Sequence, residues 1–155
     1  MEGVADLRWQ DDEQLHLTLR FVGEVERPVA NDLAAALTQI RFDRFDLALD
    51  GVGKFEHRRR GALWAGVAPK DRLKALNAKI DRACQAAGLE PERRAYHPHV
   101  TLARWSGRPQ GIDRYLERNS GLRSDPWQVS EFILLGSHLG RDGAHYEPVD
   151  CYPLI

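Results

Sequence analysis

The sequence predicts an α+β fold with mostly antiparallel sheet, and three observations favour this class. Alternation of apolar and polar residues, typical of half-buried strands, recurs at 15–22, 45–55, 61–68, 99–104, 127–139 and 145–155. Apolar residues at helical spacing occupy 29–40 and 70–87, with a shorter stretch at 112–118. The strand patterns more often follow one another directly than alternate strictly with helices, which favours antiparallel pairing.

The N-terminal half begins with a strand followed by a helix. The alternation at 15–22 ends at Gly23, and Pro28 stands where the first turn of a helix tolerates proline. The helix at 70–87 is the most strongly marked element, because Leu73, Leu76 and Ile80 share one face and Gly88 follows as a C-terminal stop.

Segments 45–55 and 61–68 are expected to form a hairpin with a long, arginine-rich connection. Within the first segment, the sequence GVGKF lacks the length and the Lys-Ser/Thr ending of a phosphate-binding loop, so we interpret it as a turn. The last strand, 145–155, contains Pro148, which cannot donate a backbone hydrogen bond and therefore places this strand at a sheet edge.

Length and composition predict one domain of an intracellular protein. The chain has 155 residues, 43% of them hydrophobic and 29% charged, which is typical of a soluble globular domain. It shows neither a secretory signal nor an apolar run long enough for a membrane helix, so we expect a cytoplasmic protein without membrane contact. Cys84 and Cys151 have no metal-ligand spacing, and we expect both to be buried thiols.

The net charge of −1 excludes a global positive field of the kind that drives nonspecific binding to nucleic acid duplexes. A polyanionic partner would need a local basic patch. Arginine clusters occur at 58–60 and 93–94, and we interpret such short charge runs as solvated loops.

Two short segments carry the same pair of polar residues. His16 and Thr18 alternate with leucines at 15–19, and His99 and Thr101 alternate with Val100 and Leu102, 83 residues later. Residues i and i+2 of a strand project from one face about 7 Å apart. Each segment therefore presents an imidazole and a hydroxyl to the same space, and the repetition suggests a chain built as two similar halves.

This combination of side chains suits a phosphodiester. An imidazole can donate or accept a proton at neutral pH, and a threonine hydroxyl can donate a hydrogen bond to a phosphate oxygen. Hydrolysis requires a base for the attacking water and an acid for the leaving oxygen. Two histidines could supply these roles, with the two threonines holding the phosphate.

These motifs resemble the two-histidine (2H) phosphoesterases, which are defined by paired His-x-Thr-x motifs. The resemblance runs from about Arg8 to Leu154, and the segments LHLTLRFVGEV, GVGKF, LWAGV, PHVTLAR and YPL are similar to the RNA 2′,3′-cyclic phosphodiesterases, which are also called 2′-5′ RNA ligases. The resemblance implies a bilobal, pseudo-symmetric fold with two mostly antiparallel sheets, outer helices and a central groove to which each lobe contributes one motif.

The resemblance also implies roles for individual residues. His16 matches the histidine that protonates the leaving ribose oxygen, His99 matches the one that activates water, and Thr18 and Thr101 match the hydroxyls that hold the phosphate. Arg104 matches a phosphate-binding arginine. The implied reaction leaves a 2′-phosphate end and needs no metal or other cofactor.

Three residues are expected to bind substrate, with different support. Arg104 has the parity of Val100 and Leu102, so it reaches the phosphate only if the strand ends or twists before it. Arg20 shares the parity of His16 and lines either the groove or a solvated rim. Tyr96 either stacks on a nucleobase or packs in the core.

The family usually carries another strand and helix ahead of the segment matched here, so we expect this single domain, 1–155, to lack them. Its expected partners are RNA ends or cyclic nucleotides, with no obligate protein partner and a monomeric state. Two alternatives stay open: ligation of RNA halves through a 2′-5′ bond, and an RNA-end or nucleotide binding module without turnover.

Overall fold

The computed structural model describes residues 7–141 and 143–155, apart from the side chains of residues 138, 139 and 144. The chain forms two compact units, each assembled from three separate segments. Unit 1 comprises the N-terminal residues up to Leu17 together with Leu47–Ala68 and Pro98–Trp127, and unit 2 comprises Thr18–Asp46, Pro69–His97 and Gln128–Ile155. Helices and antiparallel strands are both present, which confirms the predicted α+β class.

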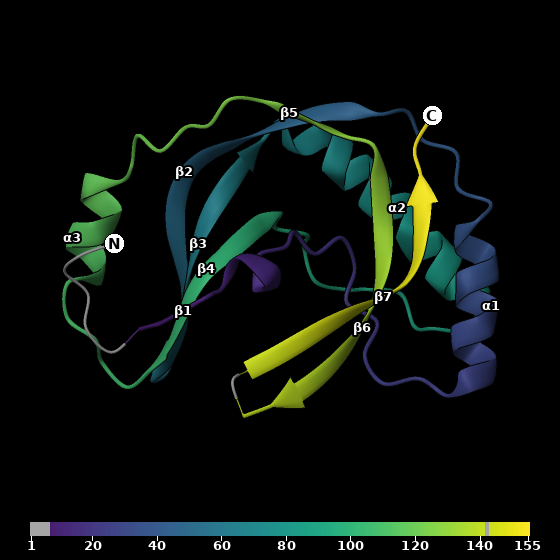
Figure 1. Cartoon of the computed structure of the whole chain (residues 1–155), viewed down its shortest axis with the longest axis horizontal. Coiled ribbons are helices and arrows are strands. Elements are labelled where there is room, and N and C mark those ends of the chain that lie inside the picture. Colours follow the sequence, from purple (N-terminus) through teal and green to yellow (C-terminus); the bar gives the residue numbers. More distant parts are fainter. Residues whose placement is uncertain (1–6, 142) are drawn as a thin grey trace. The chain divides into compact units, whose positions relative to one another are not determined.

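An antiparallel sheet forms the centre of unit 1. Strands β1 (Arg8–Trp9), β4 (His99–Ser106), β3 (Arg60–Ala68) and β2 (Phe45–His57) lie side by side in this order (Figure 1), and the short strand β5 (Trp127–Val129) follows β2 as the fifth strand. Helix α3 (Ile112–Arg118) packs against one face of the sheet, where the cluster of buried residues contains Leu63, Ala103, Trp105 and Ile112.

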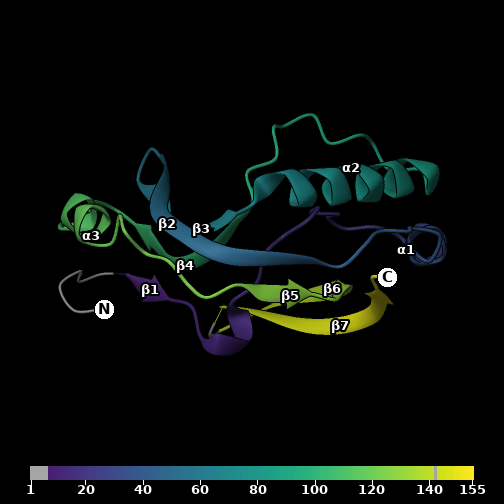
Figure 2. The ribbon, with the colours of Figure 1, turned by 90° about the horizontal axis from the view of Figure 1, so that it is seen from above.

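Strands β2 and β3 form the predicted hairpin, but the long connection was wrong. Only Arg58 and Arg59 separate the strands, and Arg58 adopts the left-handed conformation with φ 57°. The interpretation of GVGKF as a turn was also wrong, because these residues lie within β2. Gly51, with φ 74°, stands where the pairing with β3 shifts register. An irregularity of this kind bends a strand, and Figure 2 shows β2 strongly bent.

Unit 2 contains the two longer helices, α1 (Arg27–Leu37) and α2 (Lys70–Ala86), which lie side by side. Both helices and the stop at Gly88 (φ 100°) confirm the prediction. The buried residues include Leu33, Leu37, Leu73, Leu76 and Cys84. Cys84 is buried as expected, whereas the burial expected for Cys151 was wrong because this residue is exposed.

Two strands, β6 (Glu131–Gly140) and β7 (Gly143–Pro153), form a hairpin in unit 2. The single strand predicted at 127–139 is divided at Ser130 into two strands. β5 (Trp127–Val129) ends just before this residue, and β6 begins just after it. Pro148 lies inside β7, next to a shift in register. The described strands of the two units thus differ in number, unlike the two similar halves that we expected.

The strand expected at 15–22 is not regular. A single bridge joins Leu17 to Val100, and no strand is assigned from Leu15 to Val22. The carbonyl of Thr18 accepts a hydrogen bond from the Tyr96 hydroxyl (2.8 Å), and that of Leu19 accepts one from the Asn77 side chain (2.6 Å). Side chains thus take the place of a neighbouring strand. The half-buried strand expected at 15–22 was also wrong in its burial, because Leu15 and Phe21, on its apolar side, are exposed.

Candidate active site

The second His-Thr motif lies on β4, at the centre of the sheet of unit 1. His99 is paired with Gly66 and Thr101 with Trp64. The His99 ring contacts Phe55 edge-to-face at 4.9 Å between centroids, and Trp64 lies 6.1 Å away. We call the side of the sheet that carries His99, Thr101, Trp64 and Phe55 the motif face.

A β-bulge brings Arg104 to this same face. Thr101 pairs with Trp64 and Ala103 with Leu63, so Leu102 is an extra residue with no counterpart on β3. An extra residue reverses the alternation beyond it. Arg104 consequently pairs with Ala62 on the motif face. The parity difficulty seen in the sequence is thereby removed, and the exposed Arg104 side chain projects on the side of His99.

The opposite side of the sheet, which we call the helix face, is covered by α3. Leu63, Ala103 and Trp105 form the buried cluster there, with Ile112 from α3. Trp9 of β1 lies against Tyr115 of α3, with ring centroids 5.8 Å apart. Because alternate residues of a strand point to opposite faces, Arg8, next to Trp9, projects on the motif face.

The first motif approaches β4 through the bridge between Leu17 and Val100. In an antiparallel register this pairing sets His16 opposite Thr101, on the motif face. His16 and His99 therefore both lie in unit 1. This differs from the expectation that each lobe supplies one motif, because the first motif is divided between the units after Leu17.

A short turn fixes the His16 ring. The 3₁₀ turn η1 (Asp12–Gln14) is closed by a 2.9 Å hydrogen bond from the backbone amide of Asp11 to Oε1 of Gln14. The carbonyl of Gln14 lies 2.7 Å from Nδ1 of His16. A carbonyl only accepts hydrogen bonds, so Nδ1 carries a proton. This leaves Nε2 as the ring nitrogen that could exchange a proton with a ligand.

Thr18 is the first residue of unit 2, and Tyr96 holds its backbone. The Tyr96 hydroxyl donates to the Thr18 carbonyl at 2.8 Å. Burial raises the pKa of Tyr96 well above its usual range, so the hydroxyl stays protonated and keeps donating. This contact favours a positioning role for Tyr96 over the nucleobase stacking that we considered.

Arg20 occupies the interior of unit 2. Its Nε and Nη2 both lie 3.1 Å from Oδ1 of Asp81, and its Nη2 and Nη1 donate to the carbonyls of Glu90 (2.6 Å) and Phe21 (2.9 Å). The Arg20 side chain is only 7% exposed. The three guanidinium nitrogens are thus engaged within unit 2, which favours a structural role over the groove lining that we considered.

Phe55 and Trp64 are part of the site that sequence reasoning missed. Their rings contact each other at 5.3 Å, and both neighbour His99. A Cβ atom at Gly53 would come within 2.3 Å of the Trp64 indole, so this ring lies directly across the glycine. No signal in the sequence pointed to them, because Phe55 lies in the stretch that we interpreted as a turn and the register that brings it close to Trp64 is seen only in the structure.

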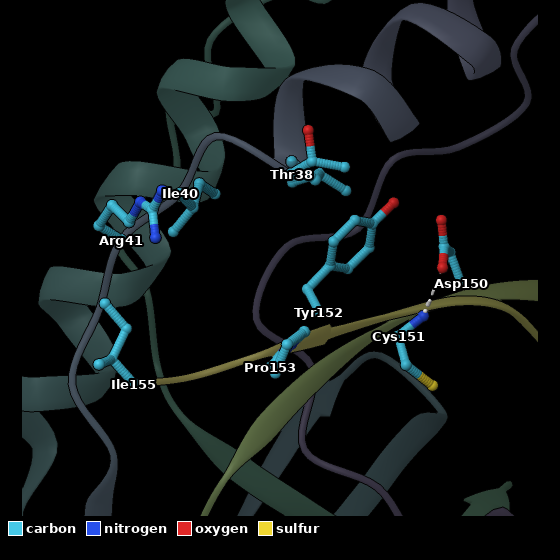
Figure 3. A pocket seen from close by; sticks show the side chains of 9 residues that line it. Thr38, Ile40, Arg41, Asp150, Cys151, Tyr152, Pro153 and Ile155 are labelled. Atoms are coloured by element: carbon cyan, nitrogen blue, oxygen red, sulfur yellow. Dashed lines mark hydrogen bonds between the residues drawn. The ribbon is translucent and has the colours of Figure 1, made fainter.

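The described residues contain no group of three or more His, Cys, Asp or Glu side chains that could hold a metal ion. No described helix is both long and apolar enough to cross a membrane. In unit 2, a cavity of about 250 Å³ lies beside Thr38, Arg41, Asp150 and Tyr152 (Figure 3). None of the predicted site residues lines this cavity.

The chain belongs to the 2′-5′ RNA ligase superfamily, whose sequence pattern matches residues 6–141. It is 36% identical over 141 residues to the RNA 2′,3′-cyclic phosphodiesterase of Aeropyrum pernix, covering 88% of this chain and 80% of that protein. It is therefore an enzyme of the RNA 2′,3′-cyclic phosphodiesterase family.

Solved structures show the same fold. The crystal structure of Escherichia coli LigT complexed with 3′-AMP superimposes with a TM-score of 0.76 at 28% identity, covering 96% of this chain and 82% of that one. The complex of LigT with NADP⁺ gives a TM-score of 0.73 at 28% identity, covering 96% of this chain and 81% of that one.

Proposed function

We propose that this protein hydrolyses the 2′,3′-cyclic phosphate at an RNA 3′ end and leaves a 2′-phosphate. His99 accepts a proton from water as its oxygen bonds to phosphorus. The bond from phosphorus to the ribose 3′ oxygen breaks on the opposite side, and that oxygen takes a proton from His16. One water is consumed, and the histidines exchange protonation states that solvent restores.

The remaining residues hold the phosphate in this proposal. The hydroxyls of Thr18 and Thr101 donate to the non-bridging oxygens, and Arg104 offsets the negative charge that develops there. We also propose that units 1 and 2 are the two lobes of the bilobal fold that the resemblance implies. The 3′-AMP and NADP⁺ bound by the LigT structures support a nucleotide as the ligand.

One observation carries the assignment to acid–base chemistry at a phosphate. The bridge from Leu17 to Val100 sets His16 opposite Thr101, while the bulge at Leu102 turns Arg104 to the side of His99. One face of one sheet thus carries two groups that can transfer protons, His16 and His99. It also carries the hydroxyl of Thr101 and the permanent positive charge of Arg104. The assignment of His16 as acid and His99 as base comes from the resemblance.

Phosphorus NMR of a purified-protein reaction with a 2′,3′-cyclic mononucleotide tests this function. We expect the cyclic phosphate resonance to be replaced by that of a 2′-phosphate, with no effect of a chelator. His16→Ala and His99→Ala should each reduce turnover by about 100-fold or more, the contribution typical of a general acid or base. His57→Ala, at the end of β2, is the control and should retain activity.

Other outcomes would select another function. A 3′-phosphate product would overturn the regiochemistry, and loss of activity in chelator that a divalent metal restores would overturn the mechanism. Joining of RNA halves through a 2′-5′ bond under the same conditions would favour the ligase alternative. Nucleotide binding without turnover would favour the alternative that the protein is an RNA-end or nucleotide binding module.

A further inference from the structure

We propose that the motif face binds an RNA chain beyond its reacting end, with Arg60 and Arg8 as contacts for further phosphates. This inference rests on the proposed function and specifies its substrate as an oligonucleotide. In this proposal the RNA chain leads away from His99 and Thr101 toward the tip of the hairpin that β2 and β3 form; Figure 1 shows these two strands.

Strand register places the arginines in line with the catalytic motif. Thr101 pairs with Trp64, Arg104 pairs with Ala62, and Ser106 pairs with Arg60. Residues 64, 62 and 60 are successive positions on one face of β3, about 7 Å apart. Arg60 therefore lies about two such steps, or roughly 14 Å, beyond Thr101. A mononucleotide has only its reacting phosphate and offers Arg60 no anion at that distance.

Arg8 widens this row on the other side of β4. It pairs directly with Arg104, and its neighbour Trp9 packs on the helix face, so the Arg8 side chain stands beside that of Arg104. Two like charges in direct opposition repel each other across a strand pair. A further phosphate bound at Arg8, beside the reacting phosphate held by Arg104, would offset this repulsion.

The part of the chain that the structure describes gives these three cations no acidic partner. Within residues 7–141 and 143–155, the structure forms no salt bridge to Arg8, Arg60 or Arg104. The motif-face positions paired across β1, β4, β3 and the end of β2 hold no acidic residue. The pattern differs from that of Lys54, which pairs with both Glu56 and Asp113 on the helix face.

An aromatic ring lies within the same row. Phe55 is opposite Ala62 and is 40% exposed. Cations that follow a backbone together with an exposed ring that can stack on a base are the usual platform for single-stranded nucleic acid. The mixed-charge cavity of about 520 Å³ on the helix face, in contrast, is lined by Lys54, Glu56, Arg58, Arg108, Asp113 and Arg114.

The test compares two substrates: a 2′,3′-cyclic mononucleotide and a six-residue oligoribonucleotide with a 2′,3′-cyclic phosphate end. For the wild type, kcat/KM should be higher for the oligonucleotide. In the double variant R8E/R60E, the ratio of the two kcat/KM values should fall at least tenfold. Arg114→Glu, on α3 at the helix face, makes the same kind of charge change and should leave the ratio unchanged.

Salt dependence provides a second readout. Each phosphate contact to a single strand contributes about 0.7 to the slope of log affinity against log salt concentration. Oligonucleotide binding by R8E/R60E should therefore show a slope smaller by about 1.4 than that of the wild type. Thermal melts of both variants check that they are folded.

The proposal is overturned if the wild type does not prefer the oligonucleotide, or if R114E lowers the ratio as much as R8E/R60E does. If the wild type opens neither substrate, the proposed function fails by itself. In that case, binding of an oligonucleotide that bears a 3′-phosphate, measured by fluorescence anisotropy, still tests whether Arg8 and Arg60 contact the RNA. Equal affinity of the wild type and R8E/R60E would then reject them.

Discussion

At the scale of single residues, the hydrogen bonds of Asp81 show how the segment after the first motif is held. The Asp81 carboxylate accepts from Arg20, from the Gln85 side chain at 2.9 Å and from the Glu92 amide at 3.1 Å. Burial by itself raises the pKa of Asp81, but these hydrogen bonds outweigh it and hold the pKa below its ordinary value of 3.8.

Asp81→Asn should therefore destabilise the protein in a pH-dependent way. A carboxylate whose pKa is depressed by folding adds stability above its unfolded pKa and loses it as the pH falls through the folded pKa. We expect a loss of about 2 kcal/mol at pH 7, the cost of weakening hydrogen bonds to a charged group.

This difference between variant and wild type should shrink as the pH falls below about 4. Urea unfolding at pH 7, 5, 4 and 3 measures it. Asp32→Asn, at an exposed position of α1, is the control and should change stability by less than about 0.5 kcal/mol. A D81N deficit that is the same at pH 3 and pH 7 would contradict the role of the charge.

At the scale of elements, each face of the β2–β3 hairpin carries a tryptophan ring that packs over a glycine. Trp64 covers Gly53 on the motif face, and Trp105 covers Gly61 on the helix face, where a Cβ atom would approach the ring to 2.1 Å. At both positions a side chain would collide with the tryptophan ring that lies over the glycine. Neither glycine has the positive φ angle that would by itself favour glycine.

Gly53→Ala should lower activity more than Gly61→Ala does at equal loss of stability. Each added methyl group must displace an indole, which costs about 1–3 kcal/mol. Only the Gly53 variant moves a ring that neighbours His99. Measurement of kcat together with the free energy of unfolding for both variants separates the effects. Equal losses of kcat would show that Trp64 does not help to position His99.

The helices were predictable from the sequence because their buried faces repeat at helical spacing and their ends carry Pro28 and Gly88. The segment 15–22 was not, because its carbonyl groups bind the side chains of Tyr96 and Asn77, which are distant in sequence. Local alternation cannot reveal such partners. The sequence did suggest both histidines and both threonines as site residues, whereas the pairing of Arg8 with Arg104 requires knowledge of the register.

At the scale of the whole molecule, the chain passes five times between the two units, after residues 17, 46, 68, 97 and 127. Neither unit is a continuous segment. If one unit unfolds, its segments become long flexible loops that join the segments of the unit that is still folded. Closing these loops costs conformational entropy and destabilises the folded unit. The interleaved chain therefore favours unfolding as one cooperative event.

Thermal unfolding should show one transition by two probes that report on different units. The four tryptophans, Trp9, Trp64, Trp105 and Trp127, all belong to unit 1, whereas the longer helices α1 and α2 belong to unit 2. Tryptophan fluorescence and far-UV circular dichroism should thus give coincident midpoints, the usual test of two-state behaviour. Midpoints that differ by several degrees would show that the units unfold separately.

The bulge at Leu102 has a practical consequence for anyone who searches for this site or transplants it. In a flat strand, groups that serve one ligand are separated by even intervals, yet three positions separate Thr101 from Arg104. The odd interval of three residues in the sequence is therefore a sign of the bulge. A search pattern that demands an interval of two or four would therefore miss this arrangement, and a graft that keeps the interval of three on a strand without the bulge would place the arginine on the opposite side of the sheet from the threonine.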